Sequence, residues 1–409
     1  MKEFFKVTSL AQVFEYMSDF PLVGTEIVSL PETDGRILAA DIVADVDLPD
    51  FARSTMDGFA VQAASTFGVS EGSPAYLTVK GSVAMGDHPV FSITTGEAAR
   101  ISTGGMLPEG ADAVVMIEHI GEIDSTTIEV YRSVAPGQHV VEKGEDFGKE
   151  EIVLCCGQKI RPQEKGLLAA FGRETVDVYQ KPVIGIISTG DEVVPVNEIP
   201  GSGQIRDINT YTIASLVIKA GGVPVTYGIA RDEFGVLFEK GSQALAQCDM
   251  VLISGGSSGG TRDFTIEALS ALPDATILVH GISISPGKPT ILAKVGSKAF
   301  WGLPGHVVSA MVVFTVAVQP FIENISGLAP QAKSEPKISA RLSRNVSSAQ
   351  GRIDYIRVRL TETKGVLWAE PVLGKSGLIH TMIKADGLIA IGENTEGLDK
   401  GAEVQVIPF

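Results

Sequence analysis

The sequence predicts a multidomain α/β protein with a central three-layer α/β domain, β-rich flanking domains and a C-terminal β-barrel-like domain. Its 409 residues exceed the length at which one hydrophobic core keeps growing. Between residues 179 and 330, apolar runs alternate with helix-length segments, which is typical of a parallel sheet covered on both faces. Before and after this segment, short β-type runs are separated by Gly and Pro clusters. We therefore expect two to four domains.

The composition excludes some partners. Lys and Arg number 33 against 49 Asp and Glu, and the net charge of -16 would repel a nucleic-acid backbone. Cys155, Cys156 and Cys248 have no metal-site spacing and no disulfide framework, which favours a reducing cytoplasm. The N-terminal segment has an acidic residue where a signal peptide would be basic, and its apolar residues follow helical spacing. The sequence thus predicts a cytoplasmic protein without a nucleic-acid or membrane partner.

The flanking regions divide into three predicted domains. Residues 1–50 and 141–178 form a mixed N-terminal domain, with an amphipathic helix capped by Ser9 and Gln12. Residues 51–140 form an inserted β-rich domain, and residues 331–409 form a C-terminal β domain. The expected strands and helix in these regions are 75–79, 99–102, 113–117, 152–154, a helix over 163–171, and strands 338–342, 354–360, 366–371, 388–391 and 403–407.

The central domain, residues 179–330, carries the clearest pattern. Apolar runs predict strands, and the segment 209–220, which precedes Gly221 and Gly222, predicts a helix. The run 307–321 is too short for a typical bilayer span, so it predicts a buried helix that ends at Pro320. The expected strands are 183–187, 223–230, 249–254, 276–279 and 299–303.

Acidic residues follow three of these strands. Glu192, Asp232 and Asp263 each come shortly after a predicted strand end, and the carboxyl ends of parallel strands meet at one sheet edge. Converging carboxylates need protons or a cation, and Mg²⁺ is a hard ion that prefers oxygen ligands. Capping of the following helix would explain each carboxylate taken singly. The three together predict a magnesium site.

Two loops predict an anion site at the same edge. Residues 254–260 (SGGSSGG) would expose backbone N–H groups to an oxyanion, although a plain tight turn has the same composition. The motif is neither a Walker A loop nor a dinucleotide fingerprint. Lys288 lies in a loop that two prolines stiffen, and a lysine fixed in this way suits an anion. The alternative is that Lys288 is an ordinary solvated surface lysine. The candidate anion-binding residues are Ser254, Gly255, Gly256, Ser257, Lys288 and Pro304.

Taken together, these motifs resemble the molybdopterin molybdenumtransferase family, which includes MoeA and the E domain of gephyrin. The resemblance runs in family order from about residue 10 to the C-terminus. It rests on residues 54–60 (STMDGFA), 101–104 (ISTG), 107–113 (LPEGADA), 144–146 (GED), 188–192 (STGDE), 254–260 with Asp263, 286–289 (PGKP) and 302–310 (GLPGHVVSA).

The resemblance implies a fold, a reaction and a site. The central domain would be of the MogA type, and the protein would be a homodimer with its cleft between protomers. The enzyme would insert molybdate into adenylylated molybdopterin, received from the adenylyltransferase, and release AMP with the help of Mg²⁺. The implied cleft residues are Asp57, Thr103, Asp146, Glu192, Asp232, Asp263, Lys288 and Ser376, with Asp57 and Thr103 facing the partner chain.

Two departures from the family pattern leave alternatives open. Val141 stands where many relatives have a basic residue, and Ser285 stands where many have Lys. Lys143 or Arg262 would be the compensating cation, and tungstate is the alternative metal substrate. The alternative functions are a molybdopterin adenylyltransferase and a non-catalytic scaffold.

Overall fold

The computed structural model describes residues 7–255, 264–332 and 337–409. The chain forms two compact units. One contains Met1–Ala40, Cys156–Arg161 and Thr175–Phe409, and the other contains Asp41–Cys155 and Pro162–Glu174. Since the two predicted N-terminal segments contribute to both units, the predicted boundaries between four domains remain predictions.

The unit formed by Asp41–Cys155 and Pro162–Glu174 is built on a six-stranded sheet in the order β7-β4-β6-β5-β9-β8. Alternating buried residues such as Phe59 and Val61 on β4 and Ile128 and Val130 on β9 fill its core. Helix α2 spans Pro162–Ala170, close to the predicted 163–171. The strands are β2 Ile42–Val43, β3 Arg53–Ser54, β4 Gly58–Val61, β5 Ala75–Val83, β6 Glu97–Ile101, β7 Ala113–Met116, β8 Ile120–Glu122, β9 Thr127–Val130, β10 Val140–Val141 and β11 Ile152–Leu154.

In the other unit, a six-stranded sheet has the order β16-β13-β17-β21-β20-β18. The first four strands are parallel, as expected, whereas β20 runs antiparallel to both of its neighbours, β21 and β18, so the sheet is mixed. β20 is not among the strands expected from the sequence, because its apolar run is short and ends at a turn. The strands are β13 Val183–Thr189, β16 Val223–Ala230, β17 Met250–Ser254, β18 Ala275–His280, β20 Ile291–Val295 and β21 Lys298–Leu303, with a small pair β14 Val193–Val194 and β15 Ile205–Arg206 beside them.

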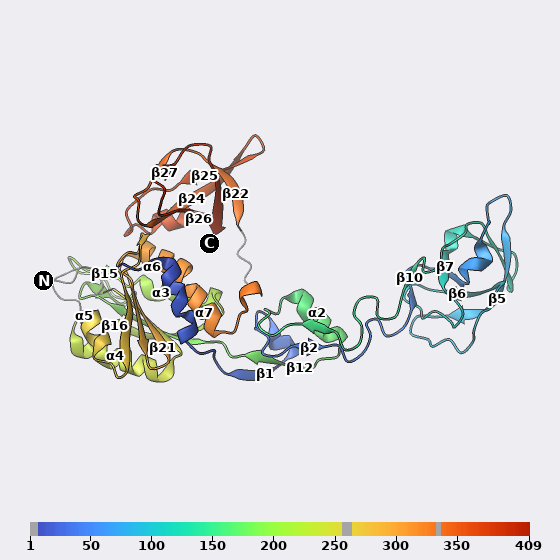
Figure 1. Cartoon of the computed structure of the whole chain (residues 1–409), viewed down its shortest axis with the longest axis horizontal. Helices are drawn as coiled ribbons and strands as arrows, with labels where there is room; N and C mark the ends of the chain where they lie inside the picture. The colour runs from blue at the N-terminus through green and yellow to red at the C-terminus, as the bar shows by residue number, and fades with distance from the viewer. Residues whose placement is uncertain (1–6, 256–263, 333–336) are drawn as a thin grey trace. The chain divides into compact units, whose positions relative to one another are not determined.

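Helices cover both faces of this sheet, which makes the three-layer α/β domain that the sequence predicts (Figure 1). One apolar cluster joins one sheet face to α1, α3 and the long helix after β21, and it includes the fully buried Trp301. A second cluster joins the opposite face to α4 and α5. The helices are α1 Leu10–Glu15, α3 Asn209–Lys219, α4 Phe234–Gln247 and α5 Phe264–Ser270. Ser9 and Gln12 form the predicted capping box of α1.

The long helix after β21 continues past Pro320, so the predicted end at this residue is wrong. Its parts are α6 Val307–Val313, a π-helical turn η5 Phe314–Val318 and α7 Gln319–Ile325. Pro320 lies in the first turn of α7 after the π-helical turn, where a missing N–H costs little. Val307–Ile325 is long and apolar enough to cross a membrane, but most of it is buried inside the protein, as in a core helix.

The C-terminal strands form a closed five-stranded barrel, β24-β25-β22-β28-β26, in which β26 pairs back with β24. This confirms the predicted barrel-like domain. The short strand β19, Ile284–Ser285, comes from the α/β domain and pairs with the start of β24. The barrel strands are β22 Ile338–Leu342, β24 Ile353–Thr363, β25 Val366–Pro371, β26 Gly387–Ile391 and β28 Glu403–Pro408; β23 Val346–Ser347 pairs with β27 Gly397–Leu398, and α8 spans His380–Ile383.

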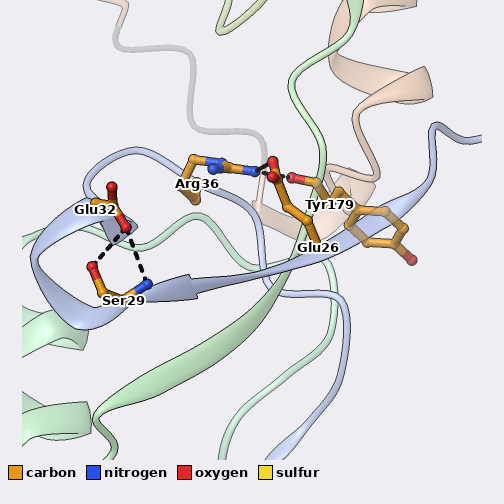
Figure 2. A network of polar contacts seen from close by, with 5 residues as sticks. All are labelled: Glu26, Ser29, Glu32, Arg36 and Tyr179. Atoms are coloured by element: carbon orange, nitrogen blue, oxygen red, sulfur yellow. Dashed lines mark hydrogen bonds and ion pairs between the residues drawn. The ribbon is translucent and has the colours of Figure 1, made fainter.

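The early chain is fixed against β12, Thr175–Tyr179, by strand β1, Thr25–Ser29. Figure 2 shows the polar contacts at this point: the Arg36 guanidinium donates to the Glu26 carboxylate and to the carbonyl of Tyr179. Glu32 accepts hydrogen bonds from the backbone N–H and hydroxyl of Ser29. These contacts tie residues 26–36 to β12, the strand that precedes β13 of the central sheet in the chain.

Candidate functional site

The carboxyl ends of β16, β13, β17 and β21 lie side by side. Thr189 is in register with Ala230, and Ser254 is in register with both Ser188 and Leu303. The loops that follow these strands therefore converge on one edge of the sheet, where ligands of open α/β sheets bind.

A cavity of about 830 Å³ lies at this edge. Its walls come from the loops of the α/β domain and from the C-terminal barrel, which contributes Arg352, Ser376 and Gly377. Six predicted site residues line it together: Glu192, Asp232, Gly255, Lys288, Pro304 and Ser376.

Asp232 is held by the strand end beside it. The Thr189 hydroxyl donates to its carboxylate at 2.5 Å, and the Asp232 N–H donates to the Asp191 carboxylate at 3.2 Å. Glu192 follows the same strand as Thr189 and lies exposed on the cavity wall. Two of the three predicted metal-binding carboxylates thus share one cavity, while the third, Asp263, lies outside the described residues.

Gly255 brings the main chain unusually close to the neighbouring strand. It has φ +110°, and a Cβ at this position would lie 2.2 Å from the carbonyl oxygen of Thr189. Only glycine fits this approach. Ser254 precedes it with a buried hydroxyl that has no hydrogen-bond partner among the residues that the structure describes, and it does not line the cavity. The predicted anion-binding residues Gly256 and Ser257 lie outside the described residues, as does Arg262.

The loop that carries Lys288 is fixed by its own backbone. The carbonyl of Lys288 accepts hydrogen bonds from the N–H groups of Ile282 and Thr290, both at 2.9 Å. The Thr290 hydroxyl donates to the carbonyl of Gly287 at 2.6 Å. The loop backbone is thereby anchored while the Lys288 side chain remains exposed at the cavity.

Arg352 is a cavity residue that the sequence analysis missed. Its Nε lies 3.0 Å from the buried carboxylate of Asp354 on β24. Burial disfavours the ionised form of this carboxylate, but hydrogen bonds from Ser348, Ser285 and the Ala349 N–H, with the charge of Arg352, outweigh it and lower the pKa of Asp354. A charged Asp354 therefore holds Arg352 beside Ser285.

This arrangement is relevant to Ser285, which stands where many relatives have a lysine. Lys143, one expected substitute, forms an ion pair with Asp47 at 3.3 Å and belongs to the other unit. Arg352 lines the cavity and shares its partner Asp354 with Ser285. Nothing in the sequence distinguishes it from a surface arginine in a hairpin, because its partner Asp354 becomes informative only once the barrel is closed.

Two further cavity residues also escaped the sequence analysis. Asp207 is buried and accepts hydrogen bonds from the hydroxyl of Ser188 and from the N–H and hydroxyl of Thr210, so it caps the start of α3. Asn209 donates from its side-chain amide to the carbonyl of Gly305 at 2.9 Å. The spacing Asp-x-x-Thr before a predicted helix was the available signal for Asp207.

The remaining predicted residues lie in the other compact unit. The Asp57 carboxylate accepts hydrogen bonds from the N–H of Thr103 at 2.7 Å and from its hydroxyl at 3.1 Å. Both side chains are exposed. Asp146 is exposed, and its N–H donates to the carbonyl of Leu48.

The cavity therefore combines groups for both signs of charge. Acidic side chains can hold a hard cation, and basic side chains with a backbone approach at Gly255 can hold phosphate or another oxyanion. The acidic lining residues are Glu192, Asp207 and Asp232, and the basic ones are Arg206, Lys288 and Arg352. This combination suits a ligand that carries phosphate.

Known families match the chain along most of its length. The MoeA N-terminal region, domains I and II, matches residues 8–172; a probable molybdopterin binding domain matches 185–324; and the MoeA C-terminal region, domain IV, matches 339–409. The fold and these matches thus define a multidomain protein whose central domain belongs to the probable molybdopterin binding domain family.

Relatives of known name agree with this class. The molybdopterin molybdenumtransferase of Haemophilus influenzae is 33% identical over 94% of each chain, and that of Bacillus subtilis is 32% identical over 94% of this chain and 89% of its own. The crystal structure of the molybdopterin biosynthesis MoeA protein from Pyrococcus horikoshii OT3 aligns over 99% of this chain and 100% of its own, with a TM-score of 0.85 and 32% identity. The chain belongs to the MoeA family, the family of the molybdopterin molybdenumtransferases.

Proposed function

We propose that this protein is a molybdopterin molybdenumtransferase that inserts molybdate into adenylylated molybdopterin and releases AMP. The main support is that Glu192, Asp232, Gly255 and Lys288 line one cavity at the strand ends. The names of the relatives support the same reaction. The substrate contains a phosphoanhydride, and the cavity supplies groups for both its phosphates and a cation that neutralises them.

The residues at the cavity fit a magnesium ion. Mg²⁺ keeps several waters and is usually held by one or two carboxylates together with substrate phosphates. Glu192 and Asp232 line the cavity together, and we expect Asp263 to join them. Within residues 7–255, 264–332 and 337–409, no three His, Cys, Asp or Glu side chains form a ready-made metal cluster. A site completed by substrate phosphate and water agrees with that finding. The bound ion would polarise the phosphoanhydride.

The chain's own residues would orient the substrate around that site. Lys288 and Arg352 attract anionic oxygens, and the backbone at Gly255 approaches them without a side chain in the way. Thr189 fixes the carboxylate of Asp232, which spares the cost of ordering it when the substrate binds. Preorganised donors and acceptors of this kind account for much of the catalysis of phosphoryl chemistry.

An activity assay separates this reaction from the alternatives. Purified protein with Mg²⁺, molybdate and adenylylated molybdopterin should release AMP and leave molybdenum on the pterin. An adenylyltransferase would instead consume ATP with molybdopterin and form pyrophosphate, and a scaffold would do neither. Replacing molybdate with tungstate tests the alternative metal substrate. No molybdate-dependent AMP release from an intact, folded protein would refute the proposal.

We further propose that the active form is a homodimer in which Asp57, Thr103 and Asp146 of one protomer complete the cavity of the other. Exposed apolar side chains on α3, Tyr211 and Ile218, support association with a second copy. Mixing inactive Asp57→Asn protein with inactive Asp232→Ala protein should restore about a quarter of the activity, because half of the random dimers carry one intact site. Mixing without recovery would refute the shared site.

The remaining parts of the proposal concern the cellular setting. The three cysteines are thiols, which fits a reducing cytoplasm. The adenylylated substrate would be handed over by a molybdopterin adenylyltransferase. Fractionation of cells and crosslinking to the adenylyltransferase would test these two points.

A further inference from the structure

His306 and Ser376 meet at the cavity wall. The hydroxyl of Ser376 lies 3.0 Å from Nδ1 of His306, and both residues line the cavity. His306 comes from the loop between β21 and α6, whereas Ser376 comes from the C-terminal barrel. Sequence reasoning gave His306 no role, since the histidines are scattered along the chain.

The main chain around this pair is fixed on both sides. The N–H of Val308 donates to the carbonyl of Ser376 at 3.1 Å, and the amide of Asn209 holds the carbonyl of Gly305. A Cβ on Gly377 would lie 3.7 Å from Cδ2 of His306, so the ring edge lies near that glycine. The imidazole is thus oriented by neighbours yet exposed toward the cavity.

The charges that share the cavity with this imidazole are balanced in sign. Glu192, Asp207 and Asp232 come from the loops after β13, β15 and β16, and Arg206, Lys288 and Arg352 come from β15, the loop after β19 and the start of the barrel. Exposed Lys375 lies beside Ser376 in the sequence. An imidazolium at this position would add one positive charge to this balance and so favour anion binding.

We propose that His306 is an oxyanion-binding residue of this cavity and that Ser376 orients its imidazole. A ring whose Nδ1 faces Ser376 can present Nε2–H to an anion. The imidazolium has a proton on both nitrogens, so it can hold Ser376 and the anion at once, with the stronger, charge-assisted bond to the anion. The choice of molybdate as that anion rests on the proposed function.

The test uses sodium molybdate alone, titrated into the full-length protein by calorimetry at about pH 6 and about pH 8, on either side of the ordinary imidazole titration. We expect tighter binding at the lower pH. In His306→Asn, binding at the lower pH should weaken about tenfold, and most of the pH dependence should disappear. His380→Asn is the matched control, since His380 is exposed in the barrel but does not line the cavity.

The orienting role of Ser376 is tested by a double variant. If Ser376 acts through His306, Ser376→Ala should weaken binding in the parent protein but add little in His306→Asn. Molybdate binding of unchanged strength and pH dependence in His306→Asn, or in His306→Gln if the first variant unfolds, would overturn the proposal. A further full loss from Ser376→Ala in the double variant would overturn the orienting role alone.

These outcomes are independent of the proposed reaction. Because the titration contains no pterin, a protein that binds molybdate through His306 but releases no AMP would refute the transferase and leave this inference intact. The reverse result, AMP release without any effect of His306→Asn on molybdate affinity or on its KM, would refute the inference and leave the transferase intact.

Discussion

The guanidinium of Arg352 lies 3.0 Å from the carboxylate of Asp354, and this pair joins the barrel to the cavity. Asp354 is almost fully buried, and its pKa is lowered because hydrogen bonds and the nearby cation outweigh the cost of burial. Its partners include Ser285, which directly precedes the loop that carries Lys288. One buried carboxylate thereby positions elements from two domains.

Asp354→Asn should destabilise the protein by roughly 1–3 kcal/mol at neutral pH, since hydrogen bonds to a charged group are lost. A carboxylate whose folded pKa is lowered stabilises the fold above its unfolded value, near 3.8 here, and that contribution disappears as the pH falls through the folded pKa. The gap in unfolding free energy between parent and variant should therefore be constant from about pH 5 to pH 7 and shrink below about pH 4. Urea titrations across this range measure it; a gap that widens toward acid would contradict the assignment.

Gly255→Ala should impair activity strongly, because the new Cβ would lie 2.2 Å from the Thr189 carbonyl at a positive φ. We expect a destabilisation of about 2 kcal/mol or a shift of the loop that lowers kcat/KM at least tenfold. Gly235→Ala in α4 is the matched control, since nothing lies within 4 Å of its added Cβ and alanine favours helix. Thermal unfolding and AMP release report both effects. Unchanged values in Gly255→Ala would show that the close approach is unimportant.

Lys288→Met should raise the KM for adenylylated molybdopterin about tenfold or more, because a charge-assisted hydrogen bond to an anionic oxygen is lost. The fold should be retained, as the Lys288 side chain is exposed and the loop is held by backbone hydrogen bonds. Lys294→Met on β20 removes the same charge from a residue that does not line the cavity. Equal effects of the two substitutions on KM would mean that only net charge matters.

Thr189→Val removes the hydroxyl that fixes Asp232 while keeping the size of the side chain. The magnesium concentration needed for half-maximal activity should rise about fivefold, as expected for the loss of about 1 kcal/mol of positioning. Thr189→Ser keeps the hydroxyl and should retain most of the affinity. If the valine and serine variants need the same magnesium concentration as the parent, Thr189 does not position the carboxylate.

Much of the central domain was predictable because its strands are buried on both faces. Apolar runs of this kind predicted strands at 183–187 and 249–254, close to the observed Val183–Thr189 and Met250–Ser254. The edge strand Val223–Ala230 was predicted with both ends correct, and Glu192 and Asp232 were placed at one sheet edge. The strand Ile291–Val295 was missed because its apolar run is short. Such a run also does not show that the strand is antiparallel to its neighbours. The helix end at Pro320 was wrong because the π-helical turn, which allows the helix to continue, depends on packing that no local pattern reveals.

Site residues were predictable only where they lie in a loop directly after a predicted strand. Arg352 and His306 acquire their meaning from the fold: an ion pair within the barrel and a contact between barrel and α/β domain. The cap by Asp207 is local, but only the fold shows that this residue lines the cavity. No spacing rule links residues that lie 70 positions apart, as His306 and Ser376 do. Sequence patterns therefore do not predict site residues that come together from different domains.

The role of Asp232 is tested by measuring AMP released and molybdenum bound to pterin in the same reaction, for the parent protein and for Asp232→Ala. We expect equal amounts of both products from the parent, dependence on Mg²⁺, and neither product from a variant whose thermal unfolding is unchanged. Full, magnesium-dependent formation of both products by Asp232→Ala would contradict this role.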